Sequence, residues 1–177
     1  MKGTITVPVK LDEKTFKRFS RFDMFRLRKR WRRPVGFALI LIAFAVVALV
    51  SGKAQAAMLA SVLLVVGLGL PLAYFGTFFS QVNMQAAQRQ LEKGRRVYTV
   101  KLDFDGVTVT NDQKEEPPVV LKWSEVQAAF QNKGCVYLYA NAVKAFLLPD
   151  GQADAPDGEV WAYIVEHMGD RAKSLIK

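Results

Sequence analysis

The chain has 177 residues, 51% of them hydrophobic, and a formal net charge of +9 at pH 7. Residues 1–34 hold 12 basic residues against 3 acidic ones, whereas residues 97–177 hold 8 basic residues against 12 acidic ones. A nucleic-acid-binding domain needs a basic face of its own, so this distribution argues against nucleic acid as a partner. The single cysteine, Cys135, excludes an internal disulfide and a cysteine-rich metal site.

The N-terminal segment, residues 1–34, is predicted to hold a short strand and a basic amphipathic helix. Residues 4–11 alternate polar and apolar side chains, and Pro8 has no N–H, which restricts this strand to a sheet edge or an isolated arm. Asp12 is the expected N-cap of the helix that follows. The apolar stripe of this helix consists of Phe16, Phe19, Met24, Leu27 and Trp31. Two placements stay open: the headgroup layer beside anionic lipid, or packing of the aromatic residues on the C-terminal domain.

Residues 35–80 are predicted to form a transmembrane α-helical hairpin. Two apolar runs, residues 35–51 and 56–79, are separated by a short turn that contains Lys53. At about 1.5 Å per residue they make helices of about 25 Å and about 36 Å, against a hydrocarbon core of about 30 Å. Helices that are apolar all round cannot be hidden beneath so few remaining residues, so the pattern indicates membrane spans rather than a soluble core.

Basic residues flank both ends of this hairpin on the same side. Those that crowd the start of the first span are Arg26, Arg28, Lys29, Arg30, Arg32 and Arg33, and residues 81–96 hold 4 more against 1 acidic residue. Lysine and arginine near the ends of spans stay on the cytoplasmic side. We therefore expect a multi-pass protein of the cell (inner) membrane, with both termini cytoplasmic and the turn outside.

Small residues recur at four-residue spacing in the second span, Ala56 with Ala60 and Ala57 with Ser61. Such spacing lets helix backbones approach closely, either within the hairpin or between protomers, so a homo-oligomer stays open. Beyond the span, residues 81–96 are expected to form a juxtamembrane stalk, helical to Lys93 and ended by Gly94.

From residue 97 onward the period of the apolar pattern changes to two, which predicts antiparallel strands. The expected strands are residues 97–104, 107–110, 119–123, 126–131, 135–139 and 143–148. A terminal helix should follow, with Trp161, Ile164, Val165, Met168, Ala172 and Leu175 on one face. Residues 97–177 are thus predicted to form an α+β domain or an open barrel capped by one C-terminal helix. Its expected core residues are Trp123, Tyr137, Tyr139 and Trp161.

Several segments of this domain resemble those of the bacterial YcxB-like family of small membrane proteins. They are Phe104-Asp105-Gly106-Val107, Leu121-Lys122-Trp123-Ser124-Glu125-Val126, Val136-Tyr137-Leu138-Tyr139 and Ala145-Phe146-Leu147-Leu148-Pro149. The resemblance covers nearly the whole chain and implies a pleckstrin-homology-like (PH-like) fold for residues 97–177. Many relatives carry basic residues after this proline, whereas this chain has Asp150-Gly151, so an anionic ligand site at this loop is not carried over from the resemblance. The family offers no established activity or catalytic residues.

Residue types that carry chemistry are sparse. His167 has neither a cysteine nor a second histidine nearby and is expected on the surface of the terminal helix. Cys135 opens an apolar strand and is expected to be a buried thiol, while Ser124 and Glu125 between two strands predict an ordinary turn. The sequence therefore indicates no enzyme, and it names no catalytic, metal or cofactor-binding residue and no cofactor.

These patterns predict a membrane-anchored, non-enzymatic interaction or scaffold module that displays the small C-terminal domain in the cytoplasm. A sheet edge, or the groove between sheet and helix, would bind an unidentified protein segment or a headgroup. In the alternative hypothesis the protein is an accessory subunit of a larger membrane transport or envelope complex, which it joins through its hairpin. In a third hypothesis the arginine-rich helix senses anionic lipid headgroups of the bilayer.

Overall fold

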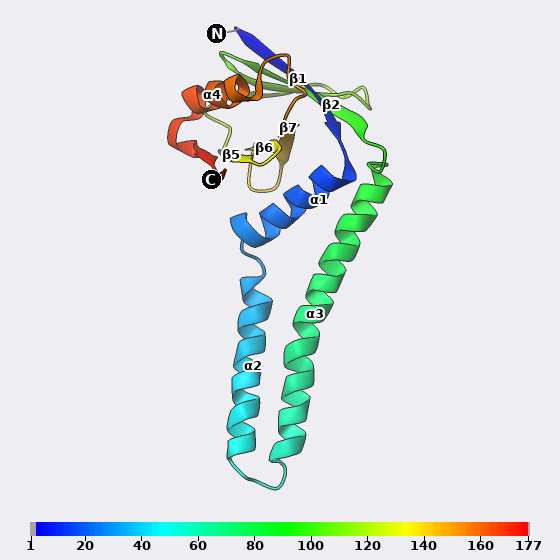
Figure 1. Ribbon diagram of the computed structural model, residues 1–177, viewed down its shortest axis with the longest axis vertical. Coiled ribbons are helices and arrows are strands. Elements are labelled where there is room, and N and C mark those ends of the chain that lie inside the picture. The colour runs from blue at the N-terminus through cyan, green and yellow to red at the C-terminus, as the bar shows by residue number, and fades with distance from the viewer. Residues whose placement is uncertain (1–2, 177) are drawn as a thin grey trace. The chain divides into compact units, whose positions relative to one another are not determined.

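The computed structural model describes residues 3–176, which divide into two compact units (Figure 1). The β-rich unit contains the chain up to Phe16 and the chain from Gln90 onward, and the helical unit is Lys17–Arg89. The predicted combination of a helical hairpin with an α+β part is confirmed at this level. The N-terminal strand belongs to the β-rich unit although the whole hairpin separates it from the other strands in sequence.

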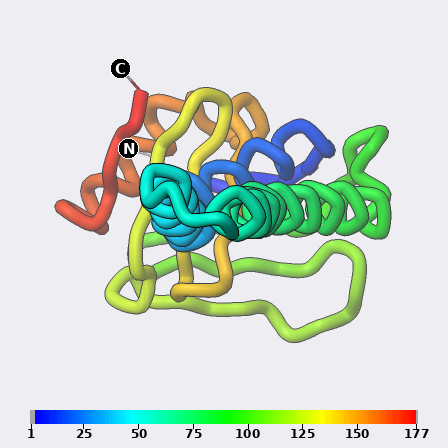
Figure 2. The backbone as a smooth tube through the Cα atoms, turned by 90° about the horizontal axis from the view of Figure 1, so that it is seen from below, coloured from blue at the N-terminus to red at the C-terminus, as the bar shows by residue number. Residues whose placement is uncertain are grey.

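The helical unit is built around a hairpin of α2 (Arg32–Val50) and α3 (Ala56–Gln88), which Figure 2 shows from the side of its turn. Both helices are long and apolar enough to cross a membrane. Only 11% and 17% of their most apolar stretches are buried, whereas the core helix of a soluble protein is mostly buried. The exposed apolar side chains therefore suit contact with lipid.

Small side chains hold the two helices together. Ala45 and Ala48 of α2 form a buried cluster with Ala60 of α3. Nearer the middle, a Cβ added at Gly67 would lie 3.2 Å from the Cβ of Leu41, so the helix backbones are closely spaced there as well. Close spacing of this kind increases van der Waals contact between helices in lipid.

The two rows of small residues in α3 have different environments. Ala56 and Ala60 are buried against the hairpin, with 8% and 2% of their surfaces exposed. Ala57 and Ser61 are exposed, and the Ser61 hydroxyl donates a hydrogen bond to the Ala57 carbonyl. The first row therefore packs within the chain, and only the second row remains available to another helix.

The end of α3 differs from the expected stalk. The helix ends at Gln88 rather than at Lys93, and Gln90 adopts a left-handed conformation with φ of 54°. Leu91 is 1% exposed, and its carbonyl accepts hydrogen bonds from the N–H groups of Glu13 and Gly94. Burial of Leu91 in the β-rich unit stabilises this turn. The polar residues before Leu91 do not predict this early end of the helix.

The N-terminal helix is shorter than expected and is followed by a turn. Helix α1 (Glu13–Phe22) leads into a π-helical turn, Asp23–Leu27, and α2 begins only at Arg32. Residues of this segment that lie outside the predicted apolar stripe contact α3. Within the helical unit, Phe25 stacks on Phe75 with ring centroids 6.1 Å apart, and the Arg21 guanidinium lies over Phe79.

The predicted N-cap of α1 is confirmed, because Asp12 Oδ1 accepts a 2.8 Å hydrogen bond from the Thr15 N–H. A hydrogen bond from the Thr15 side chain and, to a smaller extent, this backbone bond lower the pKa of Asp12 below its ordinary value of 3.8. Because the pKa is lower in the folded state, the cap stabilises α1 at pH values above the pKa of the unfolded state. This stabilisation is lost as the pH falls through the pKa of the folded state.

We expect Asp12→Ala to lower the unfolding free energy by about 1 kcal/mol at pH 7. The difference from the unchanged protein should shrink once the pH is low enough to protonate the cap. Thermal unfolding of the full chain in detergent at several pH values measures this. Glu115→Ala removes an exposed carboxylate without a cap and is the control. A difference that stays constant at acid pH would contradict the capping role.

The first sheet of the β-rich unit is antiparallel, with the strand order β1-β2-β3-β4. Its strands are β1 (Thr4–Leu11), β2 (Arg95–Asp103), β3 (Gly106–Asn111) and β4 (Val119–Lys122). Strand β1 is an edge strand, as Pro8 predicted, and it pairs with β2 so that Val7 lies opposite Val100. The buried side chains of β1 are Ile5, Val7, Val9 and Leu11.

The second sheet has the strand order β7-β6-β5-β8. Its strands are β5 (Ala128–Asn132), β6 (Cys135–Tyr139), β7 (Ala145–Pro149) and β8 (Ala172–Ser174). Every residue of β6 is buried, which confirms the prediction for Cys135. Strand β8 is parallel to β5, so the purely antiparallel sheet expected from the sequence is wrong at this edge.

The terminal helix is shorter than its apolar spacing predicted. Helix α4 (Asp157–Met168) ends at Gly169, whose φ of 54° suits glycine, and Ala172 and Leu175 lie beyond the helix. Pairing with the edge of β5 satisfies backbone groups that a longer helix would leave open, and the Leu175 N–H donates to the Gln131 carbonyl. The buried face of α4 consists of Val160, Tyr163, Ile164 and Met168.

The expected core residues differ in burial. Trp123, Tyr137 and Tyr139 are 7%, 0% and 3% exposed. Trp161 is only half-buried. It lies beside the face of α4 that contacts the sheets, because Val160 and Ile164 take the central positions of that face.

Candidate functional site

The outer edge of β1, where a peptide would add as a strand, is occupied by the chain itself. The Asp154 carboxylate accepts a hydrogen bond from the Thr6 N–H at 2.9 Å, and the Asp154 N–H donates to the Thr6 carbonyl. The Gln152 side chain makes the equivalent pair of bonds with the N–H and carbonyl of Lys10. Pro8 between them has no N–H to offer. This edge is therefore closed to strand addition.

The outer edge of β7 is closed by one side chain. The Tyr98 hydroxyl accepts a 2.7 Å hydrogen bond from the Leu147 N–H and donates to the Leu147 carbonyl at 3.2 Å. Its ring also packs edge-on against Phe146, with centroids 5.7 Å apart. Tyr98 of β2 thus joins the two sheets and satisfies the backbone groups on which an added strand would depend.

The outer edge of β4 is short. The Lys122 N–H donates to the Glu125 carboxylate at 2.9 Å, and the Lys122 carbonyl accepts from the Glu125 N–H. Pro118 precedes the strand and has no N–H. Within the described chain Val120 alone is left with outward backbone groups on this strand, which is too little for a stable added strand. The edges of β1, β7 and β4 therefore offer little to an added strand, and binding at a sheet edge stays a prediction.

Between the strands and α4 the structure leaves a small space. The space bounded by Val7, Leu148 and Val160 has a volume of about 10 Å³, which is room for one water molecule at most. Asp150 borders it, and burial together with the charge of Asp157 raises the pKa of this carboxyl. This space is too small for a peptide or a headgroup.

An aromatic cluster at one end of the β-rich unit is more accessible. His167 of α4 stacks on Trp123 and on Tyr163, with ring centroids 4.9 Å and 4.4 Å away. The His167 Nδ1–H donates a 2.8 Å hydrogen bond to the Tyr163 carbonyl, one turn earlier. Phe104 lies edge-on to His167 at 6.0 Å and is 80% exposed. The half-buried His167 therefore contacts both the buried ring of Trp123 and the exposed ring of Phe104.

The turn that carries Phe104 is firmly built. Asp103 Oδ1 accepts hydrogen bonds from the N–H groups of Asp105 and Gly106, at 3.1 Å and 2.9 Å. The Asp103 carbonyl accepts a 2.9 Å bond from Trp123 Nε1. These bonds fix the backbone of the turn, which holds Phe104 outside the sheet and leaves its side chain exposed.

Acidic residues lie close to Phe104 in sequence and near the aromatic cluster. Asp103 and Asp105 flank Phe104 in sequence, and Glu166 precedes His167 on α4. Burial, and then the charges of Asp103 and Glu166, raise the pKa of Tyr163, which places both carboxylates near the cluster. We refer to Phe104 with Asp103, Asp105 and Glu166 as the Phe104 surface.

The Trp-Ser-Glu segment has structural roles throughout. Trp123 belongs to the aromatic cluster, and the Ser124 and Val126 carbonyls accept hydrogen bonds from Arg171, at 3.3 Å and 2.6 Å. Glu125 closes the edge of β4. The predicted turn at Ser124 and Glu125 is confirmed. Among residues 3–176, no group of three His, Cys, Asp or Glu side chains is placed to hold a metal ion.

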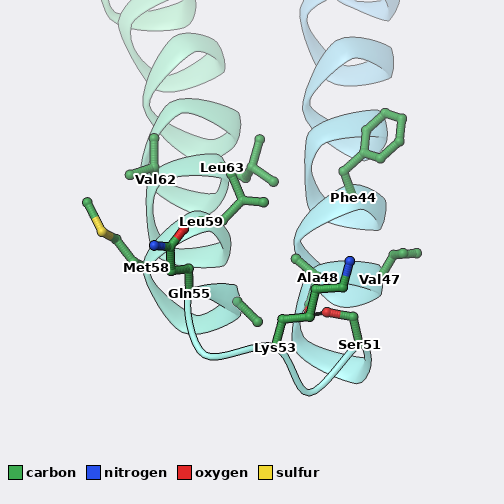
Figure 3. A pocket seen from close by; sticks show the side chains of 11 residues that line it. Phe44, Val47, Ala48, Ser51, Lys53, Gln55, Met58, Leu59, Val62 and Leu63 are labelled. Carbon is green, nitrogen blue, oxygen red and sulfur yellow. Dashed lines mark hydrogen bonds between the residues drawn. The ribbon is translucent and has the colours of Figure 1, made fainter.

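A cavity of about 700 Å³ lies in the helical unit beside the turn of the hairpin (Figure 3). Phe44 and Val47 line it from α2, and Met58, Leu59 and Val62 line it from α3. Lys53 and Gln55 of the turn lie at its rim. An apolar groove with one cation at its rim suits hydrocarbon better than a polar substrate.

The basic residues expected to set the topology lie around the turn before α2 and on its first helical turn. Arg28, Lys29, Arg30 and Arg33 line a second cavity of the helical unit, whereas Arg26 and Arg32 do not. The sequence identified all six as a charge cluster. The sequence does not distinguish the four residues that line this cavity from Arg26 and Arg32. The apolar pattern does not predict the turn before α2 that brings the four residues together.

Phe104 lies beyond the end of β2, whereas the alternating apolar pattern predicts it in a strand. The flanking aspartates and the following glycine are a turn signal, and they place the aromatic residue at the tip rather than in the ladder. No protein-family model matches this chain, and no curated protein matches it with significant similarity.

Proposed function

We propose that the protein is a membrane-anchored, non-enzymatic interaction module of the bacterial inner membrane, with both termini in the cytoplasm. The hairpin anchors the β-rich unit, and the Phe104 surface binds the partner. We further propose a relationship to the YcxB-like family and a PH-like character for the β-rich unit. The two four-stranded sheets with one helix near the C-terminus support this.

The observation that carries the proposal is the exposure of Phe104 on a hydrogen-bonded turn. Its ring is 80% exposed on a turn held by Asp103, while two sheet edges of the same unit are closed by other residues. Aromatic residues at the centre of an interface contribute much of its binding energy. Carboxylates around the ring favour a partner segment that presents an apolar side chain between lysines or arginines.

The test is photocrosslinking of the full chain in bacterial membranes. Benzoylphenylalanine in place of Phe104 should give a specific adduct with a partner protein. The adduct should decrease several-fold when Asp105→Lys is added, because the charge next to the ring is reversed.

Val143 provides a matched control position. It is 84% exposed, and its turn is built in the same way, with Asn141 Oδ1 accepting hydrogen bonds from the N–H groups of Val143 and Lys144. Benzoylphenylalanine at Val143 should give little or no adduct. Equal adducts at both positions, or none at Phe104, would contradict the proposal.

The exposed row of Ala57 and Ser61 favours an alternative, an accessory subunit that joins a larger membrane complex or a second copy through α3. The same experiment with the photoreactive residue at Ser61 tests it. Adducts at Ser61 without adducts at Phe104 would favour the subunit and contradict the module.

A further inference from the structure

We propose that the cavity lined by Arg28, Lys29, Arg30 and Arg33 binds the phosphate headgroup of an anionic phospholipid. This cavity, which we call the arginine pocket, has a volume of about 580 Å³ and is completed by Pro34 and by Tyr74 of α3. The inference rests on the proposed topology only in placing the pocket at the cytoplasmic surface of the membrane. The pocket itself is formed entirely by residues of the helical unit.

The backbone before α2 is shaped to gather these cations. The Arg28 N–H donates to the Asp23 carbonyl at 2.9 Å, and the Arg30 N–H donates to the Met24 carbonyl at 3.0 Å. Between them Lys29 adopts a left-handed conformation with φ of 49°, which is uncommon for a residue with a side chain. Residues held in such conformations beside a π-helical turn are frequent at functional sites.

The pocket has an excess of positive charge. Arg28 forms an ion pair with Asp23, with its Nε 2.8 Å from Oδ2. Lys29, Arg30 and Arg33 are exposed and have no acidic partner among residues 3–176. The positive end of the α2 dipole adds to this field. A phosphate accepts several charge-assisted hydrogen bonds from guanidinium groups and would relieve the repulsion between them.

Apolar surface next to the pocket favours a lipid over free phosphate. Phe37 follows Arg33 by one helical turn, and Leu70 precedes Tyr74 by one turn on the antiparallel helix, so both lie on the side of the hairpin turn. They are 49% and 50% exposed. A phospholipid would place its phosphate among the cations and its acyl chains along these side chains, with the Tyr74 hydroxyl at headgroup level.

The test measures phospholipid binding to the purified full chain in detergent by native mass spectrometry. The unchanged protein should retain phosphatidylglycerol in preference to phosphatidylcholine. Arg30→Gln with Arg33→Gln should reduce the retained phosphatidylglycerol by about tenfold, since each basic residue near a bilayer surface contributes appreciably to anionic lipid binding.

Arg26→Gln with Arg32→Gln is the matched control, because it removes the same charge from the same segment outside the pocket. This pair should reduce binding only slightly. An equal reduction by both pairs, or no preference for phosphatidylglycerol in the unchanged protein, would overturn the inference. Displacement of the lipid by millimolar inorganic phosphate alone would overturn the lipid as ligand.

Lysine at both positions provides a variant that keeps the charge. Arg30→Lys with Arg33→Lys should retain intermediate binding, because lysine cannot donate the paired hydrogen bonds of a guanidinium. Helix content measured by circular dichroism should be equal in all variants, since the exchanged side chains are exposed. A reporter fused after Lys177 tests the topology separately, so failure of the proposed membrane orientation is distinguishable from failure of the pocket.

Discussion

Replacing Trp123 by alanine is expected to lower the unfolding free energy of the β-rich unit by about 3–5 kcal/mol. The indole is 7% exposed, and its Nε1–H donates to the Asp103 carbonyl. Its ring stacks on His167 and contacts Tyr163 at a centroid distance of 6.2 Å. The substitution removes the buried area, leaves the carbonyl without its donor and opens a cavity between sheet and helix.

Hydrogen exchange of the β6 amides in the full chain measures this effect. These amides are buried at the centre of the second sheet, so they exchange through opening of the whole unit. We expect Trp123→Ala to accelerate their exchange by about 100-fold or more.

Trp161 provides the matched comparison. It is the same residue type in the same unit but is only half-buried. Trp161→Ala should lower the unfolding free energy by about 1 kcal/mol, in proportion to the smaller area that it buries. Equal effects of the two substitutions would show that Trp123 is not a centre of the core.

Replacing Gly106 by alanine is expected to lower the unfolding free energy by about 2–3 kcal/mol. A Cβ at this position would clash with the Leu121 carbonyl oxygen and would lie 2.9 Å from its carbon and 3.0 Å from the Cα of Lys122. These are backbone atoms of β4 rather than the end of a flexible side chain. Strand β4 must therefore move away from β3, and the ladder between them is disrupted.

Faster amide exchange in β3 and β4 and a lower midpoint of thermal unfolding check this prediction. Gly158→Ala is the control, because Gly158 lies inside α4 and an added Cβ meets nothing within 4 Å. That substitution should raise stability by about 0.5–1 kcal/mol, since alanine favours a helix. A Gly106→Ala protein as stable as the Gly158→Ala protein would show that β3 and β4 tolerate separation.

The proposals for the Phe104 surface and for the arginine pocket are independent of each other. The first concerns a protein partner of the β-rich unit, and the second concerns lipid bound to the helical unit. The crosslinking and the lipid-binding experiments therefore succeed or fail separately. If both succeed, the protein is a partner-binding module whose anchor prefers anionic membrane.

Several features follow from local patterns alone. The two apolar runs, the edge position that Pro8 imposes and the cap by Asp12 were all evident from residue type and spacing. Each depends on the solvent preference or backbone chemistry of residues close together in sequence. Such preferences do not depend on the tertiary fold of the rest of the chain.

Other features depend on partners distant in sequence. Asp154 closes the edge of β1, 148 positions away from Thr6, and Tyr98 closes the edge of β7, 49 positions away from Leu147. No spacing rule predicts which side chain reaches an open strand. The sequence therefore does not predict which side chains occupy these two edges.

The ends of α3 and α4 also depend on segments distant in sequence. The apolar spacing from Trp161 to Leu175 favours one helix, yet the chain after Gly169 pairs with β5, and α3 stops where Leu91 becomes buried. Sequence by itself determined the hairpin of two long apolar helices, the strand-forming period and the basic flank. Only the tertiary structure decided where helices end, which strand edges are open and which side chains share a cavity. The physical reason is that backbone hydrogen bonds and buried area are satisfied by whichever distant segment the fold brings near.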